Sequence, residues 1–174
     1  MAGEYEALLY RARALRSNGD PHNEGCYAVA TDSLVSEVLV HAVGRAIVSA
    51  GCGSGLLEQL VRLKAPDTSI LGVELPSCNV RWLPKTHIRR IPTFRDCYPT
   101  APDEVLLLCC PVKQDHYLRS EQTKARKIIL VEAPELECFP SGADLQKHCA
   151  RLGWSYQTRT TADGNIIHVG TRRE

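Results

Sequence analysis

A short glycine-rich loop between an apolar run and a helical run constrains the fold of this chain most. Residues 46–50 have the apolar character of a buried strand, and residues 56–64 carry leucines at helical spacing. Gly51, Gly53 and Gly55 form a GxGxG loop between the two. Glycine lets the backbone turn sharply and approach a ligand closely, and the following helix offers unpaired N–H groups at its positive end. The segment therefore predicts a strand–loop–helix unit with a ligand site at the loop.

Similar apolar and helical runs alternate along the rest of the chain. Helical spacing extends over residues 4–17, 31–44, 113–123 and 142–152. Runs of strand length cover residues 69–75, 87–91, 104–110, 127–132, 154–160 and 165–171. The last two runs flank an Ala-Asp-Gly turn, which is typical of a hairpin.

This order predicts an α/β fold with a single-domain Rossmann-like sheet. We expect about seven strands, mostly parallel, with a C-terminal antiparallel β-hairpin, a reversed strand at the sheet edge and helices on both faces. Residues 1–45 would supply N-terminal helices and residues 46–174 the cofactor-binding sheet core, so that residues 1–174 form one domain. Ligands on such a sheet bind at the carboxyl ends of the strands.

The composition bears on the partners and the location of the protein. Lys plus Arg number 21 against 20 Asp plus Glu, so the overall charge gives no sign of a nucleic-acid or membrane partner. The N-terminus lacks the apolar core of a secretion signal, and no stretch reaches the ~18 apolar residues of a membrane span. We therefore expect a soluble, cytoplasmic protein that has no membrane partner.

The eight cysteines form no CxxC pair, and several lie inside apolar runs, at Cys52, Cys109, Cys110 and Cys149. This pattern predicts buried free thiols rather than disulfides. Cys109 and Cys110 could be nucleophiles or metal ligands, but neighbouring strand residues point to opposite faces and no zinc-like spacing surrounds them. Core packing is favoured, and no metal is expected.

An acidic residue follows the glycine loop at an informative distance. Glu74 comes nineteen residues after Gly55, at the end of the next strand, where a carboxylate can accept hydrogen bonds from both ribose hydroxyls. In a dinucleotide-binding loop the third glycine usually follows the second by three residues, whereas here the interval is two and Leu56 stands at the expected place. The interval favours S-adenosylmethionine over a nicotinamide cofactor.

These motifs resemble those of the class I S-adenosylmethionine-dependent methyltransferase family, whose first motif is an apolar strand, an acid and GxGxG. Residues 27–31 and the LLLCCP run at 106–111 resemble the tyrosine segment before that motif and the active-site strand end. The resemblance implies that Tyr27 lies near the methionine part of the cofactor, that the loop wraps it and that Glu74 holds the ribose. The cofactor-binding residues it implies are Tyr27, Ser49, Gly51, Cys52, Gly53, Gly55, Glu74, Leu75, Cys109, Cys110 and Pro111.

The sequence departs from the family pattern in two places. Ser49 stands where the family usually has Asp or Glu at the end of the first strand, so this position contributes no charge toward the cofactor's ammonium group. The LLLCCPVK run lacks the NPPY-type signature of amino-methylating nucleic-acid enzymes and the Pro-Cys nucleophile of cytosine C5 enzymes. Both of those chemistries are disfavoured.

Candidate residues for the acceptor side come from two segments. Asp115 and His116, just after the fourth strand, could deprotonate an acceptor hydroxyl; solvated residues at a helix start are the plainer interpretation. Residues 81–95, from Arg81 to Arg95, hold five Arg or Lys and no acid, together with Trp82 and Phe94. This mixture is typical of single-stranded RNA binding, and charged residues that deter pairing at a sheet edge explain it as well.

Three functions remain open on these residues. The first is a methyltransferase acting on a small molecule, an RNA or a protein. The second is a degenerate, non-catalytic binding module of the same fold, which the missing acid at Ser49 and the compact size suggest. The third is a nicotinamide-dependent oxidoreductase, which the glycine interval opposes.

Overall fold

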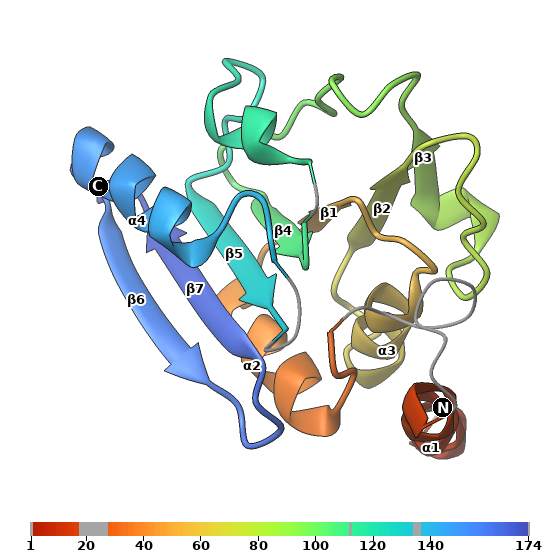
Figure 1. The fold of residues 1–174 in the computed structure, drawn as a ribbon. Helices are drawn as coiled ribbons and strands as arrows, with labels where there is room; N and C mark the ends of the chain where they lie inside the picture. The colour runs from red at the N-terminus through yellow and green to blue at the C-terminus, as the bar shows by residue number, and fades with distance from the viewer. Residues whose placement is uncertain (1, 18–27, 112, 134–136, 174) are drawn as a thin grey trace.

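The computed structural model describes residues 2–17, 28–111, 113–133 and 137–173, and these build one seven-stranded sheet with the order β3-β2-β1-β4-β5-β7-β6 (Figure 1). The strands are β1 (Ile47–Ala50), β2 (Ile70–Glu74), β3 (Ile88–Arg90), β4 (Val105–Cys109), β5 (Lys127–Glu132), β6 (Ser155–Thr160) and β7 (Ile166–Thr171). The helices are α1 (Ala2–Ser17), α2 (Asp32–Ala42), α3 (Leu56–Lys64) and α4 (Gly142–Leu152), with short 3₁₀ helices η1 (Lys85–His87) and η2 (Asp115–Leu118).

The first five strands are parallel, and they bring the predicted motifs to one edge of the sheet. The β1 strand pairs with β2 on one side and with β4 on the other, so Ser49 lies between Gly72 and Leu107. Strands in register end together, and the loops after β1, β2 and β4 therefore leave the sheet side by side. This edge is where ligands bind on open parallel sheets.

Alternating apolar residues divide the sheet into two faces, as strand geometry requires. On one face, Leu107 and Ile129 pack with the α1, α2 and α3 helices. On the other face, Leu106 and Ile128 pack with α4 and with Tyr117 of η2. Figure 1 shows α4 over the β5, β7 and β6 strands, and α1 beside α3. The expected helices on both faces are confirmed.

Two helix starts follow from their cap residues. The Thr31 hydroxyl accepts a hydrogen bond from the Leu34 N–H at the start of α2. Ser141 and Asp144 form a reciprocal capping box at the start of α4, which ends at Gly153 in the left-handed conformation. Both caps satisfy N–H groups that the first turn of a helix leaves without partners.

Two sequence-based expectations are corrected. The reversed strand is not at the sheet edge, because β7 inserts between β5 and β6, and β6 is the edge strand. Burial explains the order: Ile167 and Val169 of β7 are buried, whereas most of β6 is exposed. The helix expected over residues 113–123 is a single 3₁₀ turn, because Tyr117 is drawn into the core and its hydroxyl accepts the Tyr98 N–H.

The β6–β7 turn holds the segment that precedes α2. The Asn165 side chain accepts the Val29 N–H at 2.9 Å and donates to the Val29 carbonyl at 3.0 Å, and Asn165 is fully buried.

Within the described residues, no helix combines the length and the apolarity needed to cross a bilayer.

We predict that Asn165→Ala lowers the free energy of unfolding by about 1–3 kcal/mol, because it leaves both half-buried backbone groups of Val29 without their partner. Urea unfolding at neutral pH measures the change. Asp163→Ala, at an exposed position of the same turn, is the matched control and should change stability by less than about 0.5 kcal/mol. Equal stabilities of the two variants would contradict this role of Asn165.

Candidate functional site

The glycine loop leaves β1 as a tight turn fastened to β2. Gly51, Gly53 and Gly55 all have positive φ, at 74°, 56° and 77°. The Gly51 N–H donates to the Val73 carbonyl at 2.8 Å, and the Gly55 N–H donates to the Cys52 carbonyl at 2.9 Å. These bonds fix the loop before α3 begins.

Glu74 faces this loop from the end of β2. Its Oε2 accepts the Gly53 N–H at 2.8 Å, and its Oε1 accepts the Leu75 N–H at 2.9 Å. A carboxylate has about four acceptor sites, so two further hydrogen bonds can reach this one. The half-buried Glu74 can therefore accept from a ligand while it holds the loop.

Space around the loop differs from one glycine to the next. A Cβ at Gly51 would lie 2.5 Å from Nε2 of Gln114, which comes from the loop after β4. A Cβ at Gly55 would lie 2.8 Å from Cβ of Leu83, which comes from the loop after β2. A Cβ at Gly53 would meet nothing within 4 Å. Neighbouring loops thus flank the turn on two sides and leave room beside Gly53.

Ser49 lies below the loop and is fully buried. Its Oγ donates a hydrogen bond of 2.6 Å to Oε1 of Glu58, in the first turn of α3. The pKa of Glu58 is raised to about 7, chiefly because the carboxyl is buried. The charge of Glu74 also raises this pKa, whereas the hydrogen bond from Ser49 opposes the rise. Ser49 is therefore hydrogen-bonded to Glu58, a contact that the sequence pattern did not predict.

Cys52 packs on the sheet rather than into the open space beside the loop. A Cβ at Gly72 would lie 2.8 Å from its sulfur, so the absent side chain of Gly72 makes room for the thiol. Burial raises the pKa of Cys52, and the charges of Glu58 and Glu74 raise it further. The thiol is neutral near pH 7, which suits packing and not nucleophilic attack.

The end of β4 carries the LLLCCP run beside the loop. Cys109, Cys110 and Pro111 are buried, and Cys110 has a φ of 48°, which is uncommon for a residue other than glycine. Hydrogen bonds from the Cys109 and Cys138 thiols lower the pKa of Cys110. All seven cysteines in the described part of the chain are free, and four of them, Cys52, Cys109, Cys110 and Cys149, are buried. That part also contains no group of three His, Cys, Asp or Glu residues arranged to hold a metal ion.

The loop after β4 is held by the loop after β5. The Phe139 N–H donates to the Pro111 carbonyl at 2.6 Å, and the Gln114 N–H donates to the Phe139 carbonyl at 3.1 Å. Asp115 pairs with Arg119 at 3.3 Å. These contacts direct Gln114 toward the glycine loop and leave Asp115 engaged with its own 3₁₀ turn.

The ring nitrogens of His116 also contact neighbouring loops. Nδ1 lies 3.1 Å from the Lys113 carbonyl, and Nε2 lies 3.3 Å from the Asp96 carbonyl. The imidazole thereby joins the loop after β3 to the loop after β4. That Asp115 and His116 act as a base stays a prediction.

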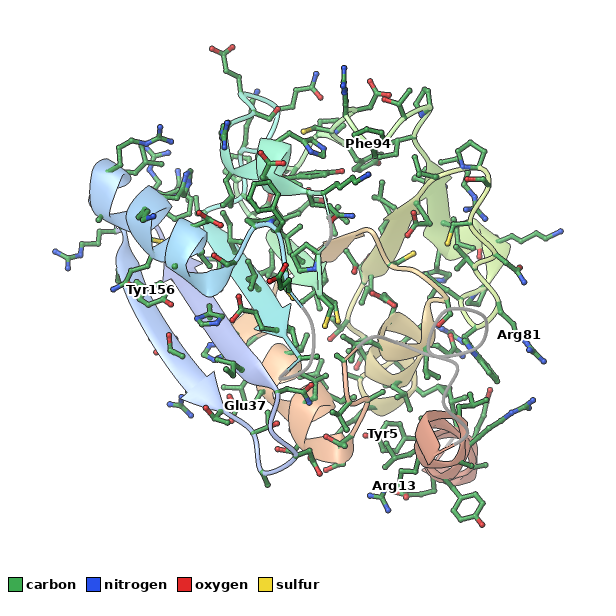
Figure 2. The ribbon with its side chains drawn as sticks, in the orientation of Figure 1. Tyr5, Arg13, Glu37, Arg81, Phe94 and Tyr156 are labelled. Carbon is green, nitrogen blue, oxygen red and sulfur yellow. The ribbon has the colours of Figure 1, made fainter. Side chains whose placement is uncertain are left out.

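Basic and aromatic side chains of residues 81–95 lie along the β3 side of the molecule, where Figure 2 shows Arg81 and Phe94. Phe94 is 43% exposed, and its ring lies 5.7 Å from the Arg95 guanidinium and 5.3 Å from Nζ of Lys113. The Trp82 ring lies 4.8 Å from the guanidinium group of Arg11 and 5.4 Å from that of Arg81. Because Lys113 follows β4, this stretch ends beside the loops at the carboxyl edge of the sheet.

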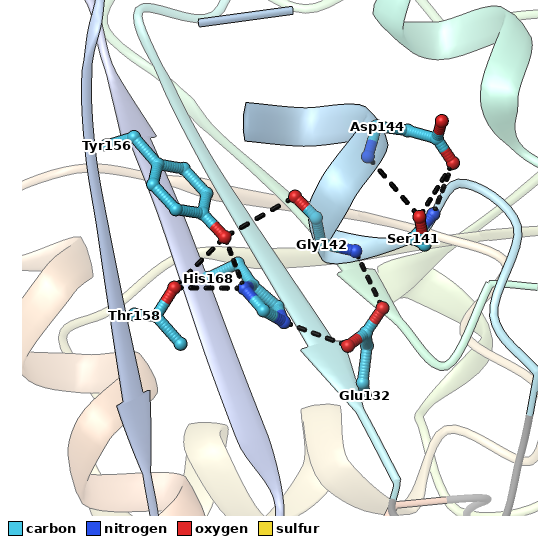
Figure 3. Close-up of polar contacts among 7 residues, drawn as sticks. All are labelled: Glu132, Ser141, Gly142, Asp144, Tyr156, Thr158 and His168. Carbon is cyan, nitrogen blue, oxygen red and sulfur yellow. Dashed lines mark hydrogen bonds and ion pairs between the residues drawn. The ribbon is translucent and has the colours of Figure 1, made fainter. Parts of the chain in front are cut away.

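A second polar cluster, drawn in Figure 3, lies farther along the sheet. Glu132 at the end of β5 contacts His168 at 2.9 Å and accepts the Gly142 N–H at 2.6 Å. The other ring nitrogen of His168 contacts the Tyr156 hydroxyl at 2.7 Å and the Thr158 hydroxyl at 3.1 Å. The cluster ties the start of α4 to three strands, and this anchoring accounts for its contacts.

Part of this candidate site could be predicted from the amino-acid sequence. Tyr27 lies outside the described residues. The glycine loop and Glu74 come together as their spacing suggested. Glu58 and Gln114 were missed: a Glu among the leucines of an otherwise apolar helix start was an available signal for Glu58, whereas only the fold brings Gln114 to Gly51.

The chain is similar to known proteins in structure rather than in sequence. No protein-family model and no curated protein sequence matches it. The methyltransferase domain of bacterial CtHen1 aligns with a TM-score of 0.59 at 15% identity, covering 79% of this chain and 95% of that one. PigF with SAH aligns with a TM-score of 0.59 at 16% identity, covering 83% of this chain and 56% of that one.

Human N-acetylserotonin methyltransferase in complex with SAM aligns with a TM-score of 0.58 at 13% identity, covering 80% of this chain and 52% of that one. The chain thus spans about half the length of this protein and of PigF. Likeness at such identities shows the fold. The chain has the Rossmann-like fold of the class I methyltransferases.

The raised pKa of Glu58 predicts a pH-dependent stability. Between pH 4.5 and about 7 the native carboxyl keeps a proton that the unfolded chain has lost, so stability falls as pH rises through this range. The loss is complete above pH 7 and corresponds to about 3 kcal/mol. We therefore expect Glu58→Gln to be about 1–3 kcal/mol more stable than the wild type at pH 8 and close to it at pH 4.5.

Urea unfolding at both pH values measures this difference. Glu121→Gln, at an exposed position, is the matched control and should show no such difference. A Glu58→Gln variant less stable than the wild type at pH 8 would show that the ionised carboxylate stabilises the fold, contrary to this prediction.

Proposed function

We propose that this chain is a methyltransferase that binds S-adenosylmethionine at the loop of Gly51, Gly53 and Gly55, and that residues 1–174 form one such domain. The single observation that carries the proposal is the hydrogen bond from Gly53 to Glu74, because it sets a carboxylate with spare acceptor capacity against a glycine turn. Solved structures of the same fold include proteins with SAM and with SAH bound.

The residues present fit this cofactor. The space beside Gly53 admits a ligand close to the backbone, and Glu74 can accept from ribose hydroxyls. The start of α3 adds the positive end of a helix dipole near the loop, which suits a carboxylate group. With Glu74 assigned to the ribose, residues at the neighbouring ends of β1 and β4 would hold the amino-acid part of the cofactor.

When bound, S-adenosylmethionine supplies an electrophilic methyl group on a sulfonium. Methyl transfer requires in-line approach of a nucleophile, so the protein contributes mainly by fixing geometry. Glu74 orients the sugar, and the buried end of β4 at Cys109, Cys110 and Pro111 excludes water from the region next to the loop. Gln114 lies beside Gly51 and borders the same region with its amide group. Asp115 or His116 would take a proton only after leaving its present partner.

Calorimetric titration with S-adenosylmethionine tests the proposal. We expect saturable binding by the wild type and a loss of roughly tenfold or more in Glu74→Ala, since the variant removes two charge-assisted acceptor sites. Glu104→Ala, whose carboxylate lies at the other end of the sheet before β4, should bind like the wild type. Absence of saturable binding by the wild type would contradict the proposal. Transfer of a labelled methyl group to cell extract then tests catalysis.

We further propose that the acceptor is a single-stranded RNA, which binds along residues 81–95. Arg89 and Arg95 are exposed and Phe94 offers a ring face, so phosphates and bases both find complementary groups. Lys113 carries this surface to the loop after β4, where an acceptor has to enter. If these charges only prevented pairing at the edge strand β3, they would not need to extend to the loop after β4.

Fluorescence anisotropy with a labelled single-stranded RNA of about twenty nucleotides tests the acceptor. We expect Arg89→Glu with Arg95→Glu to weaken binding roughly tenfold and to reduce the salt slope by about 0.7 per lost phosphate contact. Arg172→Glu, at an exposed position just after β7 and far from β3 in the strand order, is the control and carries a single charge reversal of the same type. If the double variant binds RNA as tightly as the wild type, or if the wild type does not bind RNA, then residues 81–95 do not form an RNA-binding surface.

A further inference from the structure

The pair of Ser49 and Glu58 buries a carboxylate that the fold does not explain. Glu58 is only 1% exposed, and its Oε2 is buried without a hydrogen-bond partner among the described residues. Its other oxygen accepts a hydrogen bond from Ser49. A buried carboxylate oxygen loses its hydration and here gains no partner, which is unfavourable. A native structure that keeps such a group calls for a reason beyond packing.

We propose that Glu58 supplies, from helix α3, the negative charge that favours the ammonium group of the cofactor at the glycine loop. This inference rests on the proposed function, because it concerns the same cofactor. Glu58 is a positioning residue: its carboxylate is closed off from solvent and acts through its electric field from beneath the loop.

The position of the pair supports this role. Ser49 occupies the place where the resembling family carries an acid, so β1 brings no charge to the loop. The Ser49 hydroxyl is instead bonded to a carboxylate from the first turn of α3. The strand lacks a negative charge at Ser49, and the carboxylate of Glu58, which contacts Ser49 directly, can supply it. With the ribose held by Glu74 at the end of β2, the amino-acid part of the cofactor would lie near the end of the neighbouring strand β1, which carries Ser49.

Few other charged groups act on Glu58. Glu74 and the Cys52 thiol are its titratable neighbours at this end of α3. The charge of Glu74 disfavours the ionisation of Glu58, whereas the Cys52 thiol is neutral near pH 7. A hydrogen bond to its own backbone N–H favours ionisation. The Lys64–Asp32 ion pair joins α3 to α2 about 9 Å farther along the helix. The hydrogen bonds from Ser49 and from the backbone N–H already favour ionisation, and a cation bound above the loop would add a charged group that favours it.

This arrangement links cofactor binding to proton release. The carboxyl of Glu58 is about half protonated near pH 7 in the free protein. A bound ammonium group favours its ionised form, so affinity rises with pH between about 6 and 8. A ligand without the ammonium group gains nothing from that ionisation, and its affinity should not change.

Calorimetric titrations with S-adenosylhomocysteine and with methylthioadenosine, at pH 6 and pH 8, test the inference. Methylthioadenosine keeps the adenosine and the thioether and lacks the amino-acid part. For the wild type we expect the affinity for S-adenosylhomocysteine to rise roughly five- to tenfold from pH 6 to pH 8, and that for methylthioadenosine to stay constant. Glu58→Gln should bind S-adenosylhomocysteine about tenfold more weakly than the wild type at pH 8 and lose the pH dependence.

Two comparisons separate this role from a structural one. Glu58→Gln is expected to be more stable than the wild type at pH 8, so weaker binding cannot come from unfolding. Adding Ser49→Asp to Glu58→Gln returns a charge from β1 and should restore affinity at pH 8. Failure of that rescue in a folded double variant would overturn the inference.

The remaining outcomes are also distinct. A Glu58→Gln variant with wild-type affinity and pH dependence would overturn this inference and leave the proposed function standing. The same conclusion would follow if the affinity for methylthioadenosine rose with pH as much as the affinity for S-adenosylhomocysteine. A wild type that binds neither compound contradicts the proposed function, and with it this inference.

Discussion

The hydrogen bond from the Gly53 N–H to Glu74 is the contact on which the functional account depends. It joins the loop after β1 to the end of β2, so the turn and the carboxylate cannot move independently. The bond uses one acceptor site of Glu74 and leaves others directed at the same region. A left-handed glycine is needed here, because a side chain at Gly53 would strain the backbone and fill the space beside the loop.

The rest of the structure holds this contact in place from two sides. Parallel pairing of β1 with β2 and β4 sets the three loops at one edge. Loops after β2 and β4 then flank the turn through Leu83 and Gln114. Below the turn, the carboxylate of Glu58 is buried against Ser49. Burial of this group costs stability, and a cation bound at the loop would explain why the cost is accepted. Natural proteins commonly accept such a cost at functional sites.

Most of the fold and part of the site could be predicted from the sequence. Apolar runs such as residues 104–110 identified the buried strands, and the glycine loop with Glu74 indicated the candidate ligand edge. The reversed strand β7 was misplaced because hairpin patterns do not say which strand is inner, although the apolar Ile167 and Val169 could have indicated it. The helix expected over residues 113–123 failed because the burial of Tyr117 overrides local spacing. Gln114 reaches Gly51 only through contacts between loops, which no local pattern encodes.

Nuclear magnetic resonance of the backbone amides, with added S-adenosylhomocysteine, tests the central claim most directly. The account predicts that the amide signals of Gly53 and Leu75, which both donate to Glu74, shift together as the ligand saturates the protein. Signals from the β6–β7 hairpin should stay in place. Ligand-induced shifts that spare Gly53 and Leu75 and fall elsewhere would contradict a cofactor site at this loop.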